Sequence, residues 1–488
     1  MAKVWVPIRF AALAAVFVAA DAPPGAAQAT ARVSITSAGA QANWESRQPA
    51  ISADGRFIAF VSGASNLVPG GAPDVDDVYL RDRLSGQTTC VSVATTGARG
   101  DADSDSPAIS ADGRFIAFRS YASNLVPGDA NGVEDIFVHD VRLGTTVRVS
   151  TDSAGHEADS FSDAPAISAD GAVVAFSSRA SNLAANAPAG LRGIYAHVMK
   201  TGATALVTHA FDGAAANGDS FSPSLSADGR IVAYSSPASN IVLGDFNQES
   251  DVFLTDRLTG ATSRVSVGGG GLEANSDSDS PALSGSGRAV AFRSFATNIA
   301  PGASGLGDIF LRDVSAGVTT LVSAGTSGLP ANAASEAPAI SADARFVAFQ
   351  SLASNLVASD INGWEDVFLR DVRTGQTMLI SAASAHGDYW SQAPAMTPDA
   401  LYVAFTSYAS NLDASDTNSV GDIYVRGPLS VPYSVVEAQR ALLIAAGLDA
   451  ASQFEMARLN IATAGASAAV VDVADAIRIA RKAAGLDP

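Results

Sequence analysis

Residues 107–150 decide the fold, and they read PAISADGRFIAFRSYASNLVPGDANGVEDIFVHDVRLGTTVRVS. Versions of this stretch recur along most of the chain. The copies begin at Pro49, Pro107, Pro165, Pro223, Pro281, Pro338 and Pro394. Successive starts lie 56 to 58 residues apart, which makes seven units. Long tandem repeats are typical of folds in which each unit buries its apolar face on the next.

Each unit is expected to form four strands. In the unit quoted, Pro107–Ser110 and the apolar run Phe115–Phe118 flank Asp112-Gly113, a tight-turn signal. An apolar run without alternation indicates a strand covered on both faces. Asp135–Asp140 is apolar in the middle, and Thr145–Ser150 alternates as an outer strand does. Seven such units predict an all-β fold, a seven-bladed β-propeller.

The last unit lacks a fourth strand, because it stops after Asp422–Arg426. The segment Arg32–Ser37 supplies the missing pattern, since Arg32-Val33-Ser34 matches Arg148-Val149-Ser150. We therefore expect this N-terminal strand to complete the seventh blade. Such a closure leaves the ring without an open edge.

The repeats resemble the TolB-like family of propellers, which are WD-repeat-like. The motifs Pro-x-x-Ser-x-Asp-Gly-x-x-Ile-Ala-Phe and Asp-Ile-Tyr/Phe-Val-x-Asp carry the resemblance over residues 32–427. It implies a propeller domain at residues 30–427 and leaves the activity open. The chain has no room for the N-terminal domain of TolB itself, so a role in the Tol machinery is not expected. It also lacks the Gly-x-Ser-x-Gly motif of the serine peptidases that accompany some related propellers.

Residues 1–29 have the pattern of a secretory signal peptide. Lys3 and Arg9 form a basic start, Phe10–Ala20 is apolar, and Ala27-Gln28-Ala29 suits a signal peptidase. The apolar run is shorter than the roughly 20 residues of a membrane span. We therefore expect a secreted protein, periplasmic or extracellular. With one cysteine, Cys90, it has no intrachain disulfide.

Residues 428–488 form a different module. Ser434–Leu448 and Val473–Leu486 have helical periodicity and similar sequences, and each ends in Gly-Leu. This duplicated helix resembles a dockerin, which implies calcium loops and a cohesin-like partner. The stretches before the helices, 429–432 and 464–469, contain almost no oxygen ligands for calcium. We expect a degenerate dockerin-like helical domain, with a plain helical cap on the propeller as the alternative.

The net charge limits the partners. The chain carries −19, and it carries −20 once the signal segment, with its net +1, is removed. Such an acidic surface repels nucleic acid and anionic membranes. It favours cations, basic partners or neutral ligands.

A repeated Asp-x-Asn-x-x-x-Asp motif between the second and third strands is the first candidate site. Oxygen side chains at alternate positions, followed by a carboxylate, can wrap Ca²⁺. The alternative is structural, because Asp and Asn form Asx turns. The four sets are Asp129/Asn131/Asp135, Asp245/Asn247/Asp251, Asp360/Asn362/Asp366 and Asp416/Asn418/Asp422.

Aromatic residues form the second candidate site. Trp44, Trp364, Tyr389 and Trp390 fall in long loops of units 1, 6 and 7, which are consecutive in a closed ring. Such rings can stack on a sugar or peptide. Alternatively, each ring packs under its own loop.

These features favour a binding or interaction propeller over an enzyme. The predicted ligand is a protein or carbohydrate on the long-loop face, with calcium as an optional stiffener and no required cofactor. The acidic loops at 101–106 and 273–280 are interpreted as a solvated rim, and the five histidines lack zinc-ligand spacing. No catalytic residue is singled out. The alternatives are a polysaccharide-active glycosidase or lyase, by fold analogy, and a purely structural repeat protein.

Overall fold

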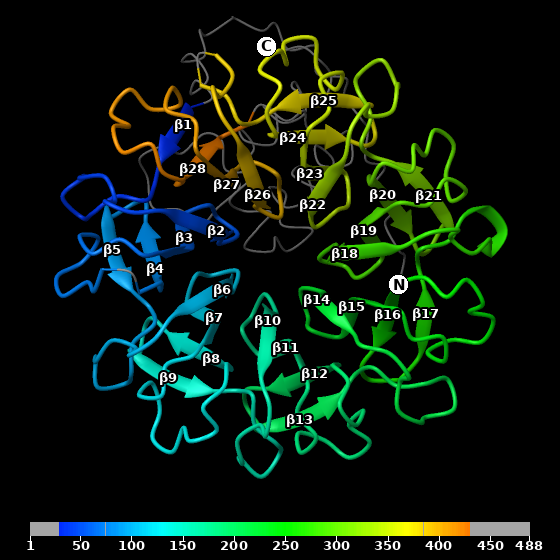
Figure 1. The fold of residues 1–488 in the computed structure, drawn as a ribbon, viewed down its shortest axis with the longest axis horizontal. Helices are drawn as coiled ribbons and strands as arrows, with labels where there is room; N and C mark the ends of the chain where they lie inside the picture. Colours follow the sequence, from blue (N-terminus) through cyan, green and yellow to red (C-terminus); the bar gives the residue numbers. More distant parts are fainter. Residues whose placement is uncertain (1–28, 74, 384, 430–488) are drawn as a thin grey trace, which may run out of the picture.

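The computed structural model describes residues 29–73, 75–383 and 385–429, which form a ring of seven four-stranded antiparallel sheets (Figure 1). The predicted all-β, seven-bladed propeller is confirmed. The predicted signal peptide, except Ala29, and the predicted helical domain, except Pro428 and Leu429, lie outside the described residues.

Each blade has an inner, a second, a third and an outer strand. The inner strands are β2 (Ser46–Ile51), β6 (Ser104–Ile109), β10 (Ser162–Ile167), β14 (Phe221–Leu225), β18 (Ser278–Leu283), β22 (Ser335–Ile340) and β26 (Ser391–Met396). The second strands are β3 (Phe57–Ser62), β7 (Phe115–Ser120), β11 (Val173–Ser178), β15 (Ile231–Ser236), β19 (Ala289–Ser294), β23 (Phe346–Ser351) and β27 (Val403–Ser407). The third strands are β4 (Asp77–Asp82), β8 (Asp135–Asp140), β12 (Gly193–Val198), β16 (Asp251–Asp256), β20 (Asp308–Asp313), β24 (Asp366–Asp371) and β28 (Asp422–Gly427). The outer strands are β5 (Gln87–Cys90), β9 (Thr145–Arg148), β13 (Ala203–Leu206), β17 (Thr262–Arg264), β21 (Val318–Leu321), β25 (Gln376–Leu379) and β1 (Ala29–Arg32).

Blades 1 to 6 follow the chain from β2 to β25, and blade 7 combines β26, β27 and β28 with β1. A short 3-10 helix, η1 (Gly269–Gly271), lies in the loop after β17. Among the described residues, no helix is long and apolar enough to cross a membrane.

The N-terminal strand closes the ring as predicted. β1 pairs antiparallel with β28, with Arg32 opposite Tyr424. The predicted strand bounds, Arg32–Ser37, were wrong, because the ladder ends at Arg32. Val33 N–H still donates to the Ile423 carbonyl at 2.8 Å, and the chain then folds back so that Ile35 bridges Gln41.

The apolar core lies between neighbouring blades. Phe118 and Phe137, on the second and third strands of blade 2, stack with ring centroids 5.9 Å apart, and every blade has an equivalent pair. Phe118 packs in one cluster with Ala59 and Val78 of blade 1. Each blade therefore needs its neighbours to bury its faces.

The inner strands differ from the prediction, because they start about three residues before the repeated proline of each unit rather than at it. A register shift interrupts each inner ladder, for example between Asp105 and Ala108. The residue before the proline has a φ of 47° to 54° in all seven blades: Gln48, Ser106, Ala164, Ser222, Ser280, Ala337 and Ala393. These bulges bend the inner strands nearest the axis of the ring.

Two kinds of loop separate the two faces. The short-turn face carries turns such as Asp112-Gly113, where Gly113 has a φ of 73° and a Cβ would lie 2.3 Å from Phe57 Cδ2. Alanine takes this position in blades 6 and 7, with φ of 60° at Ala344 and 59° at Ala400.

The opposite, long-loop face is held by a repeated asparagine. Asn124 Nδ2 donates to the Arg99 carbonyl at 2.8 Å, and its Oδ1 accepts the Asp101 N–H at 3.1 Å. The equivalent residues Asn66, Asn182, Asn240, Asn298, Asn355 and Asn411 make the same two bonds. Both long loops of each blade are thereby joined, which fixes the face where the candidate sites lie.

Candidate functional site

The Asp-x-Asn motifs lie in the loops before the third strands, on the long-loop face. In blade 2, Asn131 Nδ2 donates to Asp135 Oδ2 at 2.9 Å, and Asn131 Oδ1 accepts the Val133 N–H at 3.1 Å. Asp135 is fully buried and also accepts a hydrogen bond from Ser150. The motif therefore makes an Asx turn that leads into β8, as the structural alternative predicted.

An arginine from the outer strand enters this loop in blade 2. Arg148 Nη1 lies 3.2 Å from Asp129, 3.2 Å from Asp135 and 2.9 Å from Glu157. The Arg148 side chain is only 9% exposed. The guanidinium thus takes the central position among the three carboxylates.

Blade 4 repeats this arrangement. Arg264 Nη1 lies 3.2 Å from Asp245, 3.1 Å from Asp251 and 2.5 Å from Glu273. Asn247 Nδ2 donates to Asp251 at 3.1 Å, as its counterpart does in blade 2.

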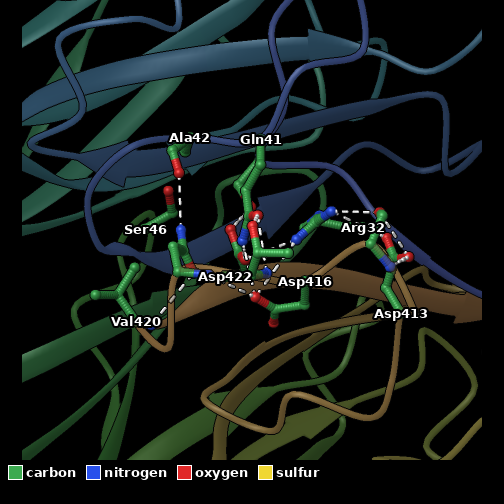
Figure 2. A network of polar contacts seen from close by, with 12 residues as sticks. Arg32, Gln41, Ala42, Ser46, Asp413, Asp416, Val420 and Asp422 are labelled. Atoms are coloured by element: carbon green, nitrogen blue, oxygen red, sulfur yellow. Dashed lines mark hydrogen bonds and ion pairs between the residues drawn. The ribbon is translucent and has the colours of Figure 1, made fainter.

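In blade 7 the arginine comes from the closing strand (Figure 2). Arg32 lies 3.3 Å from Asp413, 3.7 Å from Asp416 and 3.3 Å from Asp422. Gln41 replaces the third acid and donates to Asp416 at 2.8 Å and to Asp422 at 2.9 Å. The loop motif therefore helps to close the ring.

The asparagine of blade 7 has a different hydrogen-bond partner from its counterparts in blades 2, 4 and 6. Asn418 Nδ2 donates to the Ala42 carbonyl at 2.8 Å, and no hydrogen bond joins Asn418 to Asp422 among the described residues. Asn418 Oδ1, the atom that would bind calcium, accepts the Val420 N–H at 3.3 Å. Gln41 takes over the bond to Asp422 that the asparagine makes in the other blades. Asn418 thus has a turn and ring-closing role, and its role as a metal ligand stays a prediction.

Blade 6 keeps the motif and lacks the arginine. Asn362 Nδ2 donates to Asp366 Oδ2 at 2.8 Å, and Ser381 donates to Asp366 Oδ1 at 2.5 Å. The outer-strand position that Arg148 and Arg264 hold is Leu379, since each pairs with the third residue of its third strand. Asp360 is 6% exposed, and its buried Oδ1 has no hydrogen-bond partner among the described residues.

The acids of blades 2 and 4 are of the type that holds a metal ion. Carboxylate oxygens of Asp129, Asp135 and Glu157 lie within 4.8 Å of one another, and those of Asp245, Asp251 and Glu273 do as well. Burial raises the pKa of Asp129 and of Asp245 to about 6, the neighbouring acid adds to this, and the arginine opposes it. Calcium binding at these loops stays a prediction, and there a cation would have to displace a guanidinium.

Three of the four predicted aromatic residues form one cluster. Ring centroids of Trp364 and Tyr389 lie 4.5 Å apart, those of Trp364 and Trp390 5.6 Å, and those of Tyr389 and Trp390 5.1 Å. Tyr408 joins edge-on, 6.4 Å from Trp390. Tyr389 is 38% exposed and Trp390 is 42% exposed. We call Trp364, Tyr389, Trp390 and Tyr408 the aromatic cluster.

Trp44 stands beside this cluster, and within the described part of the chain it makes no ring contact with it. It is 53% exposed and lies against Gly63, where a Cβ would be 2.8 Å from its Cδ1. A hydrogen bond links the aromatic cluster to the loop of Trp44, because the Tyr408 hydroxyl donates to Glu45, the residue after Trp44. The aromatic cluster thus spans blades 6 and 7, and Trp44 borders it on blade 1.

The sequence interpretation missed Tyr408 and the three arginines. Arg148 was matched with Arg32 only as a strand residue. The signal was available, because an arginine at this strand position accompanies the Asp-x-Asn motif in blades 2, 4 and 7.

No protein-family model and no curated protein sequence matches the chain. Among solved structures, an oligogalacturonate lyase in complex with manganese aligns with a TM-score of 0.51 and 13% identity, covering 83% of this chain and 96% of that one. A TolB from Agrobacterium tumefaciens, described as putative, gives 0.37 and 17%, over 71% and 95%. The β-propeller domain of the Trilobed protease from Pyrococcus furiosus gives 0.45 and 10%, over 74% and 91%. At 13% identity, the likeness to the oligogalacturonate lyase concerns the fold alone.

Proposed function

We propose that the protein is a non-enzymatic binding propeller that recognises a neutral carbohydrate through the aromatic cluster. The carrying observation is the contact among Trp364, Tyr389 and Trp390 on the long-loop face, with two of the rings more than a third exposed. Sugar rings present C–H faces that pack on such aromatic surfaces, while polar groups beside them accept and donate hydrogen bonds.

The surroundings of the cluster favour a neutral ligand. Glu45 accepts a hydrogen bond from Tyr408, and Asp388 lies next to Tyr389 in the chain. The whole chain carries −19. These charges would repel an anionic polysaccharide.

A glycan array with the full chain tests the proposal, followed by calorimetric titration of the oligosaccharide that binds. Tyr389→Ala and Trp390→Ala should each weaken binding about tenfold, because a lost ring contact of about 1.4 kcal/mol corresponds to that factor. Phe246→Ala is the control, since Phe246 is an aromatic residue that is 80% exposed on the same long-loop face, in the loop between β15 and β16 of blade 4. An empty array, or binding that neither cluster variant changes, would overturn the proposal.

Two other ligand classes belong to the same test. Signal on a peptide array in place of the glycan array would assign the surface to a protein partner. Release of sugar from a polysaccharide panel would favour the alternative of a polysaccharide-active enzyme. The oligogalacturonate lyase has a similar fold, and a similar fold by itself does not imply the same activity.

The place of action we propose is the periplasm or the cell exterior, because residues 1–29 have the pattern of a signal peptide. Calcium at an Asp-x-Asn loop would stiffen the long-loop face, and binding at the cluster does not require it.

A further inference from the structure

The Asp-x-Asn loops of blades 2, 4 and 7 all contain a positive charge at the same place. In each, an arginine of the outer strand lies within 3.7 Å of both motif aspartates. Two nearby buried carboxylates are costly unless a cation compensates them. The arginine therefore has a clear structural role in these three blades.

Blade 6 has the same two aspartates without that arginine. In blades 2 and 4 the Oδ1 atom of the first aspartate and the Oδ2 atom of the second hold Nη1. Among the residues described for blade 6, the first of these atoms, Asp360 Oδ1, is buried without a partner, and the second, Asp366 Oδ2, accepts only Asn362.

The remaining neighbours do not fill the gap. Leu379 is apolar, and it packs against the core cluster of blades 5 and 6. His386 takes the position of Glu157 and Glu273, since each bridges the third residue after the outer strand of its blade. The pKa of Asp366 is raised to about 6, mainly because the carboxyl group is buried. The negative charge of Asp360 also raises this pKa, whereas the hydrogen bonds from Ser381 and Asn362 and the charge of His386 lower it. The buried pair thus lacks a permanent positive charge.

We propose that blade 6 binds one divalent cation between Asp360 and Asp366, at the place that an arginine guanidinium occupies in blades 2, 4 and 7. The ligand atoms are carboxylate oxygens, which suit the hard ions Ca²⁺ and Mn²⁺. Two protein carboxylates make a modest site, so we expect a dissociation constant of about 0.1–1 mM, as in extracellular calcium modules.

The cation site and the aromatic cluster share one loop. Asn362 Oδ1 accepts the Trp364 N–H at 2.8 Å, while its Nδ2 donates to Asp366 at 2.8 Å. An ion on Asp366 would therefore hold the turn that positions Trp364. This inference does not rest on the proposed carbohydrate function, because the ion can be counted without any glycan.

The test is calorimetric titration of the chelator-treated full chain with CaCl₂ and, separately, MnCl₂. Wild type should bind one ion per chain. Asp360→Asn should bind none, because it removes the unpartnered carboxylate at nearly constant volume. Leu379→Arg should also bind none, because it restores the arginine of the other blades. Asp313→Asn, an exposed carboxylate on the short-turn face, should keep the site.

A gain of binding provides the reciprocal control. Arg264→Leu leaves Asp245, Asp251 and Glu273 without their guanidinium, so this variant should bind two ions per chain. Quenching of tryptophan fluorescence by Mn²⁺ reports the ion near Trp364 and should vanish in Asp360→Asn. The proposal is overturned if wild type binds no ion at about 10 mM, ten times the weakest constant expected, or if Asp360→Asn binds as well as wild type.

Discussion

Replacing Arg32 tests how the ring is closed. Arg32→Ala removes a guanidinium that is 4% exposed and lies 3.3 Å from Asp422 and 3.7 Å from Asp416. Their side chains are 0% and 2% exposed, so both carboxylates would stay buried without their cation (Figure 2). The closing strand would also lose its charged anchor to β28.

The size of the effect follows from the burial. Removing one partner of a buried ion pair costs about 3–5 kcal/mol of unfolding free energy. Gln41 and Ser34 still donate to Asp422 in the variant, at 2.9 Å and 2.5 Å, which holds the loss at the lower end of that range. Arg32→Ala/Asp416→Asn should recover part of the loss, because one uncompensated charge is gone.

Urea unfolding, followed by far-UV circular dichroism and tryptophan fluorescence, measures these changes. Arg142→Ala is the matched control, because Arg142 is exposed in a short turn, and it should change the free energy by less than about 0.5 kcal/mol. A loss below about 1 kcal/mol for Arg32→Ala would contradict this role of Arg32, since the buried charges would then be compensated without the arginine.

Three further predictions concern the blades. Ala344→Gly should stabilise the protein by about 1 kcal/mol, because Ala344 has a φ of 60°; a lower urea midpoint would contradict this. Asn124→Ala should cost about 1 kcal/mol, because it removes two exposed hydrogen bonds that join the long loops and water can take their place; an unchanged midpoint would exclude the joining role of this asparagine. Burial lowers the pKa of His139 below that of the unfolded chain, so the unfolded state binds more protons and stability falls as the pH drops through about 6.5. Melting temperatures measured about one pH unit above and below that value should therefore differ less in His139→Gln than in wild type, and an equal difference would argue against this contribution.

The sequence was sufficient to predict the ring. Each repeat has its own turn signals and apolar runs, and the match of Arg32 with Arg148 predicted the closing strand. The strand bounds were wrong at Ser37, because local alternation does not show where a ladder ends. The bulges in the inner strands were missed. A tight turn is marked in the sequence by residues such as Asp-Gly, whereas no such local composition marks a bulge.

The aromatic cluster was predicted only in part. Position in the ring correctly suggested that Trp364, Tyr389 and Trp390 would lie near each other, since blades 6 and 7 are neighbours. Sequence could not show that Trp44 borders the aromatic cluster without a ring contact, because that depends on how its loop packs on Gly63.

The Asp-x-Asn motifs were visible in the sequence, and their partners were not. The arginines belong to another strand, 13 to 19 residues from the motif in blades 2 and 4. Asn418 has the same local sequence pattern as Asn131, yet Gln41 from the far end of the chain replaces its bond to Asp422. A local motif cannot show such a substitution, because the replacing side chain arrives only when the ring closes.

A crystal structure of the protein with the oligosaccharide selected on the array would show directly whether the aromatic cluster binds sugar. We expect a sugar ring within about 4 Å of the Tyr389 or Trp390 ring, on the long-loop face of blades 6 and 7. Sugar density at another blade, or on the short-turn face, with the aromatic cluster unoccupied, would contradict it.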